Sequence, residues 1–278
     1  MIVSTQELAL HLDDPEWVIF DCRHDLMKPG RGEELYREGH IPGAHFAPVD
    51  GILSGAKNGM NGRHPLPDPD VFAEFLGRHG VSDTTRVVAY DDVGGQFAAR
   101  FWWMVRWIGQ ARAALLDGGF PKWMQEGRQV TSLIPARRNA SIRAGLQPGL
   151  IWTAEDVQRQ LRVSESHLVD ARAPERFRGE VEPIDRIAGH IPGAKNRFFK
   201  MNLNGDLTFR PAHELRTEFE ALIENAAPDK VGHQCGSGIT ACANVFAMEY
   251  AGLPGSKLYV GSWSEWIADP SRPVAKGS

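Results

Sequence analysis

The hexapeptide GHIPGA occurs at residues 39–44 and again, letter for letter, at residues 189–194. An Asp-x-Arg motif stands upstream of each copy, at the end of an apolar run. It begins at Asp21 in WVIFDCR and at Asp170 in HLVDAR. Two motifs repeated in the same order, with nearly the same offset, indicate two copies of one fold instead of a short repeat array.

A third match extends the duplication toward the end of each half. LLDGGFPKW at 115–123 corresponds to LYVGSWSEW at 258–266, an offset of 143 positions. With that offset, Asp92 stands opposite Cys235. A carboxylate has no sulfur chemistry, so the second copy is predicted to be the catalytic one if Cys235 reacts.

Both halves alternate short apolar runs with amphipathic stretches. The runs lie at 18–20, 87–90, 115–116, 168–169 and 258–260, and the amphipathic stretches at 69–79, 96–109, 153–161 and 212–225. Short buried strands that alternate with helices predict an α/β fold, in which each half has a mainly parallel sheet flanked by helices. Residues 130–150, rich in Pro and Gly, are predicted to link a domain at 1–135 to a second at 149–278.

Composition excludes several classes of function. The 278 residues are 42% hydrophobic and 24% charged, with a formal net charge of -4 and no basic stripe, so no nucleic-acid or anionic-lipid partner is expected. The sequence has no run of 18 apolar residues, and its start does not resemble a signal peptide. Three sparse cysteines predict reduced thiols and a cytoplasmic protein. No metal-ligand spacing is present, so neither a metal nor a cofactor is expected.

The segment CGSGIT, from Cys235 to Thr240, has the composition of an anion-binding loop. Gly236 and Gly238 permit positive φ and a close approach of backbone to ligand. Successive N–H groups, the Ser237 and Thr240 hydroxyls and the start of a helix would lower a thiol pKa and would hold a thiolate or persulfide. Two alternatives are a buried structural cysteine and a phosphate-binding turn.

A cysteine phosphatase is disfavoured at this loop. Such sites need an arginine that closes the loop with C-x5-R spacing and clamps the phosphate with two hydrogen bonds. Ala241 occupies that position. Cys242 lies in an apolar run of the predicted helix and Cys22 lies beside Asp21 at a strand end, and both are expected to be packing residues.

Together, the repeated motifs, the single cysteine loop and the closing GSWSEW resemble the two-domain rhodanese family. The loop CGSGIT is similar to the pattern C-G-S-G-[VI]-T of its 3-mercaptopyruvate sulfurtransferase branch. The resemblance covers nearly the whole chain. It implies two tandem rhodanese-like domains, of which the first is inactive, with Asp92 at the cysteine position, and the second is catalytic through Cys235.

The resemblance also implies site residues. The persulfide loop would comprise Gly236, Ser237, Gly238, Ile239 and Thr240. Arg176 matches the first substrate-binding arginine of the family. The second usually follows Glu-Pro directly, whereas here Arg186 comes three residues after Pro183 and takes that role in a shorter loop. Arg178 is expected to be a solvated surface charge.

The branch further implies a proton relay from a histidine of the first half to the loop serine, which would pair His40 with Ser237. The alternative for His40, and for His190 in the second half, is a structural role. The Ile-Pro pair that follows each histidine forces an extended chain, and the ring would hydrogen-bond locally.

The implied function is transfer of a sulfane sulfur from 3-mercaptopyruvate to a thiol or cyanide acceptor, through a persulfide on Cys235. The acceptor could be a thioredoxin-like protein, a small thiol or cyanide. Three alternatives remain open, namely a thiosulfate sulfurtransferase, a sulfur-carrier module without turnover and a redox sensor.

Overall fold

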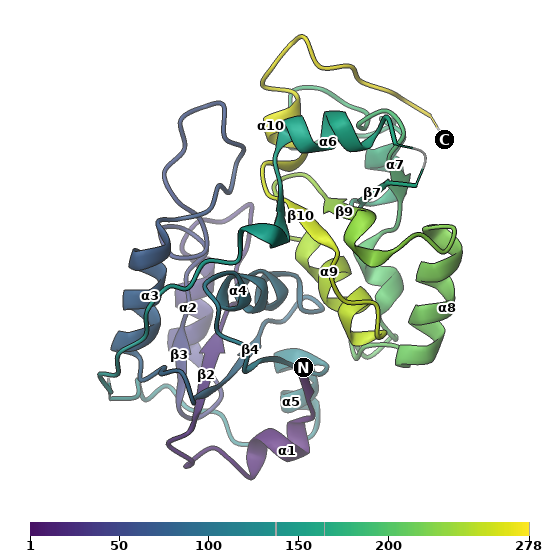
Figure 1. Ribbon diagram of the computed structural model, residues 1–278. Helices are drawn as coiled ribbons and strands as arrows, with labels where there is room; N and C mark the ends of the chain where they lie inside the picture. Colours follow the sequence, from purple (N-terminus) through teal and green to yellow (C-terminus); the bar gives the residue numbers. More distant parts are fainter. Residues whose placement is uncertain (137, 164, 278) are drawn as a thin grey trace. The chain divides into compact units, whose positions relative to one another are not determined.

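The computed structural model describes residues 1–136, 138–163 and 165–277, and its chain forms two compact units (Figure 1). The first comprises Met1–Gly55, Leu66–Gln147 and Leu203–Phe209, and the second comprises Ala56–Pro65, Pro148–Asn202 and Arg210–Ser278. Each unit therefore takes one short segment from the other half of the sequence. Arg137, within the predicted linker, lies outside the described residues.

The first unit is a five-stranded parallel sheet with strand order β1-β5-β4-β2-β3. The strands are β1 (Ile2–Val3), β2 (Trp17–Asp21), β3 (Ala44–Phe46), β4 (Arg86–Tyr90) and β5 (Ala113–Leu116). The helices are α1 (Thr5–Ala9), α2 (Arg31–Glu38), α3 (Pro69–Arg78), α4 (Gln96–Trp107) and α5 (Gly119–Gln125).

The second unit repeats this topology, with strand order β6-β10-β9-β7-β8 and parallel pairs throughout. The strands are β6 (Ile151–Trp152), β7 (His167–Asp170), β8 (Lys195–Asn196), β9 (Val231–Gln234) and β10 (Lys257–Tyr259). The helices are α6 (Ala154–Gln160), α7 (Pro174–Phe177), α8 (Ala212–Leu222), α9 (Ala241–Tyr250) and α10 (Ser262–Trp266), and the 3-10 turns are η1 (Pro148–Leu150), η2 (Phe199–Asn202) and η3 (Pro228–Lys230).

The predicted α/β class, strands and longer helices are confirmed. The elements that were not predicted include α2, although it has eight residues, and shorter ones such as α1, α7 and the two-residue edge strand β1. Three to five residues carry too little periodicity to be recognised as helix or strand.

Both faces of each sheet are covered by helices, as parallel sheets require. In β2, Ile19 packs in the cluster that includes Leu8 of α1 and Trp123 of α5, whereas Phe20 contacts Phe75 of α3 and Phe101 of α4. In the second unit, Figure 1 shows α6, α7 and α10 on one side of the sheet and α8 and α9 on the other. The central strands are therefore buried on both faces. Because they are parallel, their carboxyl ends lie together at one end of the sheet.

The repeated Asp-x-Arg motif forms the same buried ion pair in both units. The Arg23 guanidinium donates to the Asp21 carboxylate at 2.6 Å and to the Gly39 carbonyl at 2.6 Å. In the second unit, Arg172 donates to Asp170 at 2.7 Å and to the Gly189 carbonyl at 2.8 Å. Each ion pair thus joins the end of a central strand to the first glycine of GHIPGA, which explains why the two motifs repeat together.

No helix within the described residues is long and apolar enough to cross a membrane.

Candidate active site

Cys235 follows β9 directly and lies in the loop that leads into α9. Its side chain is only 2% exposed, and its Sγ accepts N–H groups of Gly238 at 3.2 Å and Ser237 at 3.5 Å. The helix begins at Ala241, with Thr240 as its N-cap. The sulfur therefore lies among backbone donors close to a helix N-terminus, an arrangement that stabilises an anion.

Two glycines shape this loop for different reasons. Gly238 has φ +80°, and a Cβ there would lie 2.3 Å from the Val260 carbonyl oxygen. Gly236 does not have positive φ, which corrects the conformational reason that the sequence suggested for it. A Cβ at Gly236 would instead lie 2.8 Å from a guanidinium nitrogen of Arg63, so glycine leaves room for side chains above the loop.

The start of α10 holds the loop from the other side. The Cys235 N–H donates to Ser262 Oγ at 3.1 Å, and the Cys235 carbonyl accepts the Trp263 N–H at 3.0 Å. The Gly236 carbonyl accepts the Ser264 N–H, also at 3.0 Å. Ser262, Trp263 and Ser264 of GSWSEW therefore hold the backbone that carries the thiol.

Ser237 does not point its hydroxyl at the sulfur. Its Oγ lies 2.7 Å from Nδ1 of His64, a buried residue of the segment Ala56–Pro65. His40 instead places Nδ1 2.7 Å from the Tyr36 carbonyl oxygen and Nε2 3.2 Å from that of Leu133. The structure thus corrects the pairing of His40 with Ser237, because both His40 ring nitrogens face backbone carbonyls of its own unit.

The structural alternative for the two GHIPGA histidines agrees with their contacts. The His190 Nδ1 lies 2.8 Å from the Phe177 carbonyl oxygen, and its backbone forms a bridge to Ala275. His40 forms the corresponding bridge to Thr131. The two histidines therefore join the GHIPGA motif of each unit to the chain that follows α5 in the first unit and α10 in the second.

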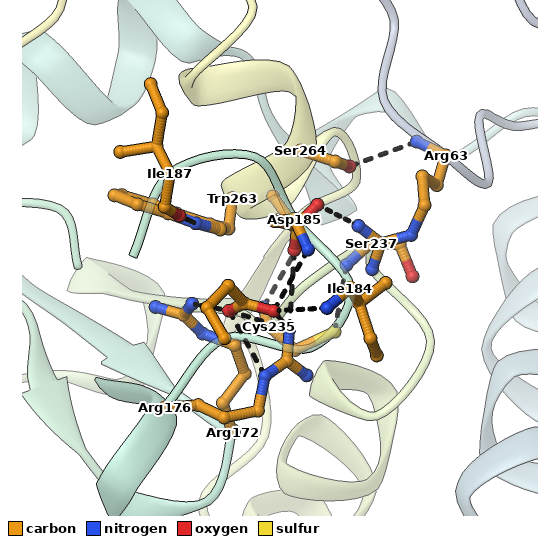
Figure 2. A network of polar contacts seen from close by, with 12 residues as sticks. Arg63, Arg172, Arg176, Ile184, Asp185, Ile187, Cys235, Ser237, Trp263 and Ser264 are labelled. Carbon is orange, nitrogen blue, oxygen red and sulfur yellow. Dashed lines mark hydrogen bonds and ion pairs between the residues drawn. The ribbon is translucent and has the colours of Figure 1, made fainter. Parts of the chain in front are cut away.

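The predicted arginines have different surroundings. Arg176 donates to Glu182 at 2.7 Å and to Asp185 at 3.3 Å, close to the cysteine loop (Figure 2). Arg186 donates to the Ile267 carbonyl and lines a pocket of about 480 Å³. Arg178 pairs with exposed Glu180, which confirms the expected surface charge.

Arg63 is a site residue that the sequence analysis missed. Figure 2 shows its guanidinium beside Asp185, above the loop of Cys235 and Ser237, and the two side chains form an ion pair. The only signal in the sequence was the dipeptide Arg63-His64 in NGRHPLP, which lies outside every repeated motif. Arg63 belongs to the second unit through the segment Ala56–Pro65, and its contact with Asp185 is a tertiary contact that no local sequence pattern indicates.

The other two cysteines are packed as expected. Cys242 Sγ donates to the Gly238 carbonyl at 3.3 Å inside α9. Cys22 is completely buried, and burial together with the charges of Asp21 and Asp91 raises the pKa of its thiol. Neither thiol lies in a loop of backbone donors like that around Cys235.

The strand register corrects the residue that stands opposite Cys235. Asp21 pairs with Tyr90 in the first sheet, and Asp170 pairs with Gln234 in the second. The next residue after β4 is Asp91, so Asp91 and not Asp92 has the place of Cys235. The difference of one residue arises because the strand-to-loop segments align with an offset of 144, whereas the offset of 143 holds for the later motif.

The chain matches the model of the Rhodanese-like domain twice, at residues 4–126 and 153–269. It is 45% identical over 278 residues to a probable 3-mercaptopyruvate sulfurtransferase of Pseudomonas aeruginosa, covering 99% of this chain and 98% of that protein. It is 37% identical over 288 residues to a putative thiosulfate sulfurtransferase of Mycobacterium tuberculosis, covering 100% and 98%.

Among solved structures, a 3-mercaptopyruvate sulfurtransferase from Leishmania major superposes with a TM-score of 0.83 at 30% identity, covering 96% of this chain and 74% of that one. The duplicated sheet, the cysteine loop confined to the second unit and these matches lead to one conclusion. The chain belongs to the rhodanese family and carries two rhodanese-like domains in tandem.

Proposed function

We propose that this protein is a sulfurtransferase that moves sulfur from 3-mercaptopyruvate to a thiol or to cyanide through a persulfide on Cys235. The observation that carries the proposal is the pair of N–H contacts to Sγ from Ser237 and Gly238. Similarity to proteins named 3-mercaptopyruvate sulfurtransferases supports the choice of donor.

In the first half-reaction, the Cys235 thiolate attacks the sulfur of the donor. A new S–S bond forms, and the C–S bond breaks with its electron pair going to carbon. The leaving group is the enolate of pyruvate, which takes up one proton. The transferred sulfur first carries the donor's S–H proton and gives it up to water. The anionic persulfide on Cys235 is then stabilised by the loop N–H groups.

Ser237 and His64 are the proposed route for that proton. The Ser237 hydroxyl lies in the loop beside the sulfur, and His64 Nδ1 is 2.7 Å from it. A protonated His64 can restore a proton that the serine hydroxyl gives to the enolate carbon. The role first assigned to His40 passes to His64 in this scheme.

In the second half-reaction, an acceptor thiolate or cyanide attacks the outer sulfur and releases the Cys235 thiolate. The two half-reactions predict ping-pong kinetics. The acceptor would be a small thiol, a thioredoxin-like protein or cyanide. We infer that the protein works in the cytoplasm, where thiols stay reduced, since all three cysteines are free.

Mass spectrometry after brief exposure to 3-mercaptopyruvate tests the intermediate. One added sulfur raises the mass of the intact protein by about 32 Da, and dithiothreitol should remove it. The adduct should be absent in Cys235→Ser and should persist in Cys242→Ser and Cys22→Ser. An adduct retained by Cys235→Ser would refute the proposal.

Thiosulfate is the second candidate donor, because a relative of 37% identity carries the name of a putative thiosulfate sulfurtransferase. Comparison of kcat/KM for the two donors, with the same acceptor, decides between them. Persulfide formation without turnover on either donor would instead favour a sulfur-carrier module.

A further inference from the structure

Asp185 lies between two guanidinium groups above the cysteine loop. Its Oδ1 pairs with Nη1 of Arg63, and its Oδ2 accepts Nη2 of Arg176 at 3.3 Å. The side chain of Asp185 is 5% exposed, and those of Arg63 and Arg176 are 27% and 18% exposed. Figure 2 shows Asp185 at the centre of this group, with one arginine on each side.

This group lies directly over the backbone that holds the thiol. A Cβ built on Gly236 would be 2.8 Å from Arg63 Nη2, 3.6 Å from Arg176 Nη2 and 3.7 Å from Asp185 Oδ2. Two guanidinium groups and one carboxylate therefore meet one residue away from Cys235. The pocket of about 480 Å³ is lined by Arg63, Asp185 and Arg186 among others.

The two carboxylates next to Arg176 are held differently. Glu182 accepts the Ile184 and Asp185 N–H groups, both at 3.0 Å, and binds Arg176 through both oxygens. Its contact with Arg176 and these backbone bonds lower its pKa despite burial. For Asp185, by contrast, burial outweighs the arginine charges and raises the pKa.

Within the described residues, the hydrogen bonds recorded for the Asp185 carboxylate go only to the two arginines. Glu182 is thus fixed by backbone N–H groups of its own loop. The Asp185 carboxylate is held by two guanidinium groups, which can also bind the carboxylate of a ligand. A guanidinium group binds carboxylates through a planar fork of donors.

We propose that Asp185 is the internal occupant of a carboxylate-binding site formed by Arg63 and Arg176, and that the carboxylate of an α-keto acid displaces it. Asp185 then moves into the space of the adjoining pocket. This inference rests on the proposed function for its substrate class. It adds Arg63 as a substrate-binding residue and makes Asp185 a determinant of donor affinity.

The proposal predicts that removal of the internal carboxylate strengthens binding. Pyruvate, which has the carboxylate and ketone but no sulfur, is titrated calorimetrically into Cys235→Ser protein. Adding Asp185→Asn should lower the Kd for pyruvate about tenfold, which corresponds to ~1.4 kcal/mol. Asp185→Ser, which removes the carboxylate with a different side chain, should act in the same direction.

Two further variants sharpen the test. Arg63→Gln should weaken pyruvate binding about tenfold, and it should abolish the gain from Asp185→Asn when the two are combined. Glu180→Gln is the matched control, because Glu180 lies in the same loop and pairs only with exposed Arg178 among the contacts recorded for the described residues. It should leave the Kd unchanged.

Unchanged or weaker pyruvate binding in both Asp185 variants would overturn the proposal, since Asp185 would then hold the arginines in place instead of competing for them. This readout needs no sulfur transfer. If the persulfide test fails while Asp185→Asn tightens pyruvate binding, the sulfur chemistry is wrong and the carboxylate site stands. If the persulfide forms while the Kd does not fall, only the present inference is wrong.

Discussion

The loop after β4 and the loop after β9 occupy the same place in their sheets but surround different groups. The Asp91 carboxylate accepts four backbone N–H groups, from Val93, Gly95, Phe97 and Ala98, at 2.8–3.1 Å. The Cys235 sulfur accepts two, at 3.2 and 3.5 Å. The carbonyl of each residue accepts one more N–H, from Phe120 in the first unit and Trp263 in the second.

This comparison teaches that the duplicated framework provides an anion-binding loop whether or not the unit is catalytic. In the first unit, a fixed carboxylate of the chain itself fills the loop and uses its donors. In the second unit, a thiol fills it with longer contacts, and arginines gather above the loop. The difference between scaffold and candidate catalyst therefore lies in one side chain and in the segments that lie over it.

The largest expected effect comes from moving the side chain of the first loop into the second. Cys235→Asp should reduce sulfur transfer by at least about 10³-fold, because a carboxylate cannot form a persulfide and the nucleophile is lost. Initial rates with 3-mercaptopyruvate and a thiol acceptor provide the measurement. Sulfur transfer that survives in Cys235→Asp would contradict the comparison.

The carboxylate of the first loop should be a structural requirement. Asp91→Ala would leave four N–H groups, two buried and two part-buried, without their acceptor and should lower the free energy of unfolding by roughly 3–5 kcal/mol. Urea unfolding provides the measurement. Asp92→Asn is the control that distinguishes the two neighbours.

For Asp92, burial is the main cause that raises its pKa to about 6. Because the folded-state value is above the usual 3.8, ionisation at pH 8 destabilises the fold, and the neutral amide should cost nothing or stabilise by up to ~1 kcal/mol. A larger loss in Asp92→Asn than in Asp91→Ala would mean that the Asp92 carboxylate, and not that of Asp91, stabilises this loop.

The two sheets also differ in how they fill one central position. Gly232 in β9 corresponds to Val88 in β4, and Trp152 in β6 corresponds to Val3 in β1. A Cβ on Gly232 would lie 2.1 Å from the Trp152 ring. Gly232→Val should therefore destabilise the protein by about 3 kcal/mol through overpacking.

The first unit has valine at both positions, Val3 and Val88, so replacing Trp152 by valine as well should restore much of the stability lost in Gly232→Val. Gly232→Val with Trp152→Val should show a coupling energy of about 2 kcal/mol in a double-mutant cycle measured by urea unfolding. Strict additivity of the two changes would show that the large and small residues do not compensate each other.

A further difference between the two sheets concerns His233, which corresponds to Ala89 in the first unit. Burial, with a smaller contribution from Arg197, lowers the pKa of His233 to about 3. The folded value is below the usual 6.5, so the unfolded chain binds the proton between pH 6.5 and 3. Stability is then complete above pH 6.5 and falls with decreasing pH, by at most ~1.4 kcal/mol per pH unit.

His233→Ala should reduce this pH dependence. The difference in unfolding free energy between parent and variant, measured in urea at several values between pH 4 and 7, isolates the contribution of the one group. A difference that does not change with pH would mean that His233 takes up its proton as readily in the folded protein as in the unfolded chain.

Several elements could be predicted because their signals are local. The strands at Val18–Phe20 and Val87–Tyr90 follow from unbroken apolar runs, and α3 follows from the amphipathic pattern of residues 69–79. The short helices α7 and α10 carry no such pattern. The cysteine loop was found because glycines and hydroxyl residues cluster within six positions.

The other contacts of the site have no local signal. His64 and Arg63 are far from Ser237 and Asp185 in the sequence, and they meet them because the segment Ala56–Pro65 belongs to the second unit. The family resemblance placed the histidine at His40, in the first GHIPGA motif. Both ring nitrogens of His40 instead face backbone carbonyls of the first unit.

The sequence by itself determined the duplication, the parallel α/β class and the single thiol at the mouth of a helix, because periodicity, glycine spacing and a repeated hexapeptide are read along the chain. Only the tertiary structure decided that Asp91 stands where Cys235 does, that His64 contacts Ser237, and that Asp185 lies between Arg63 and Arg176. Strand register and long-range contacts depend on how the strands and connecting segments pack. Burial and ion pairing stabilise contacts between residues whatever their separation in the sequence, so no local pattern reveals them.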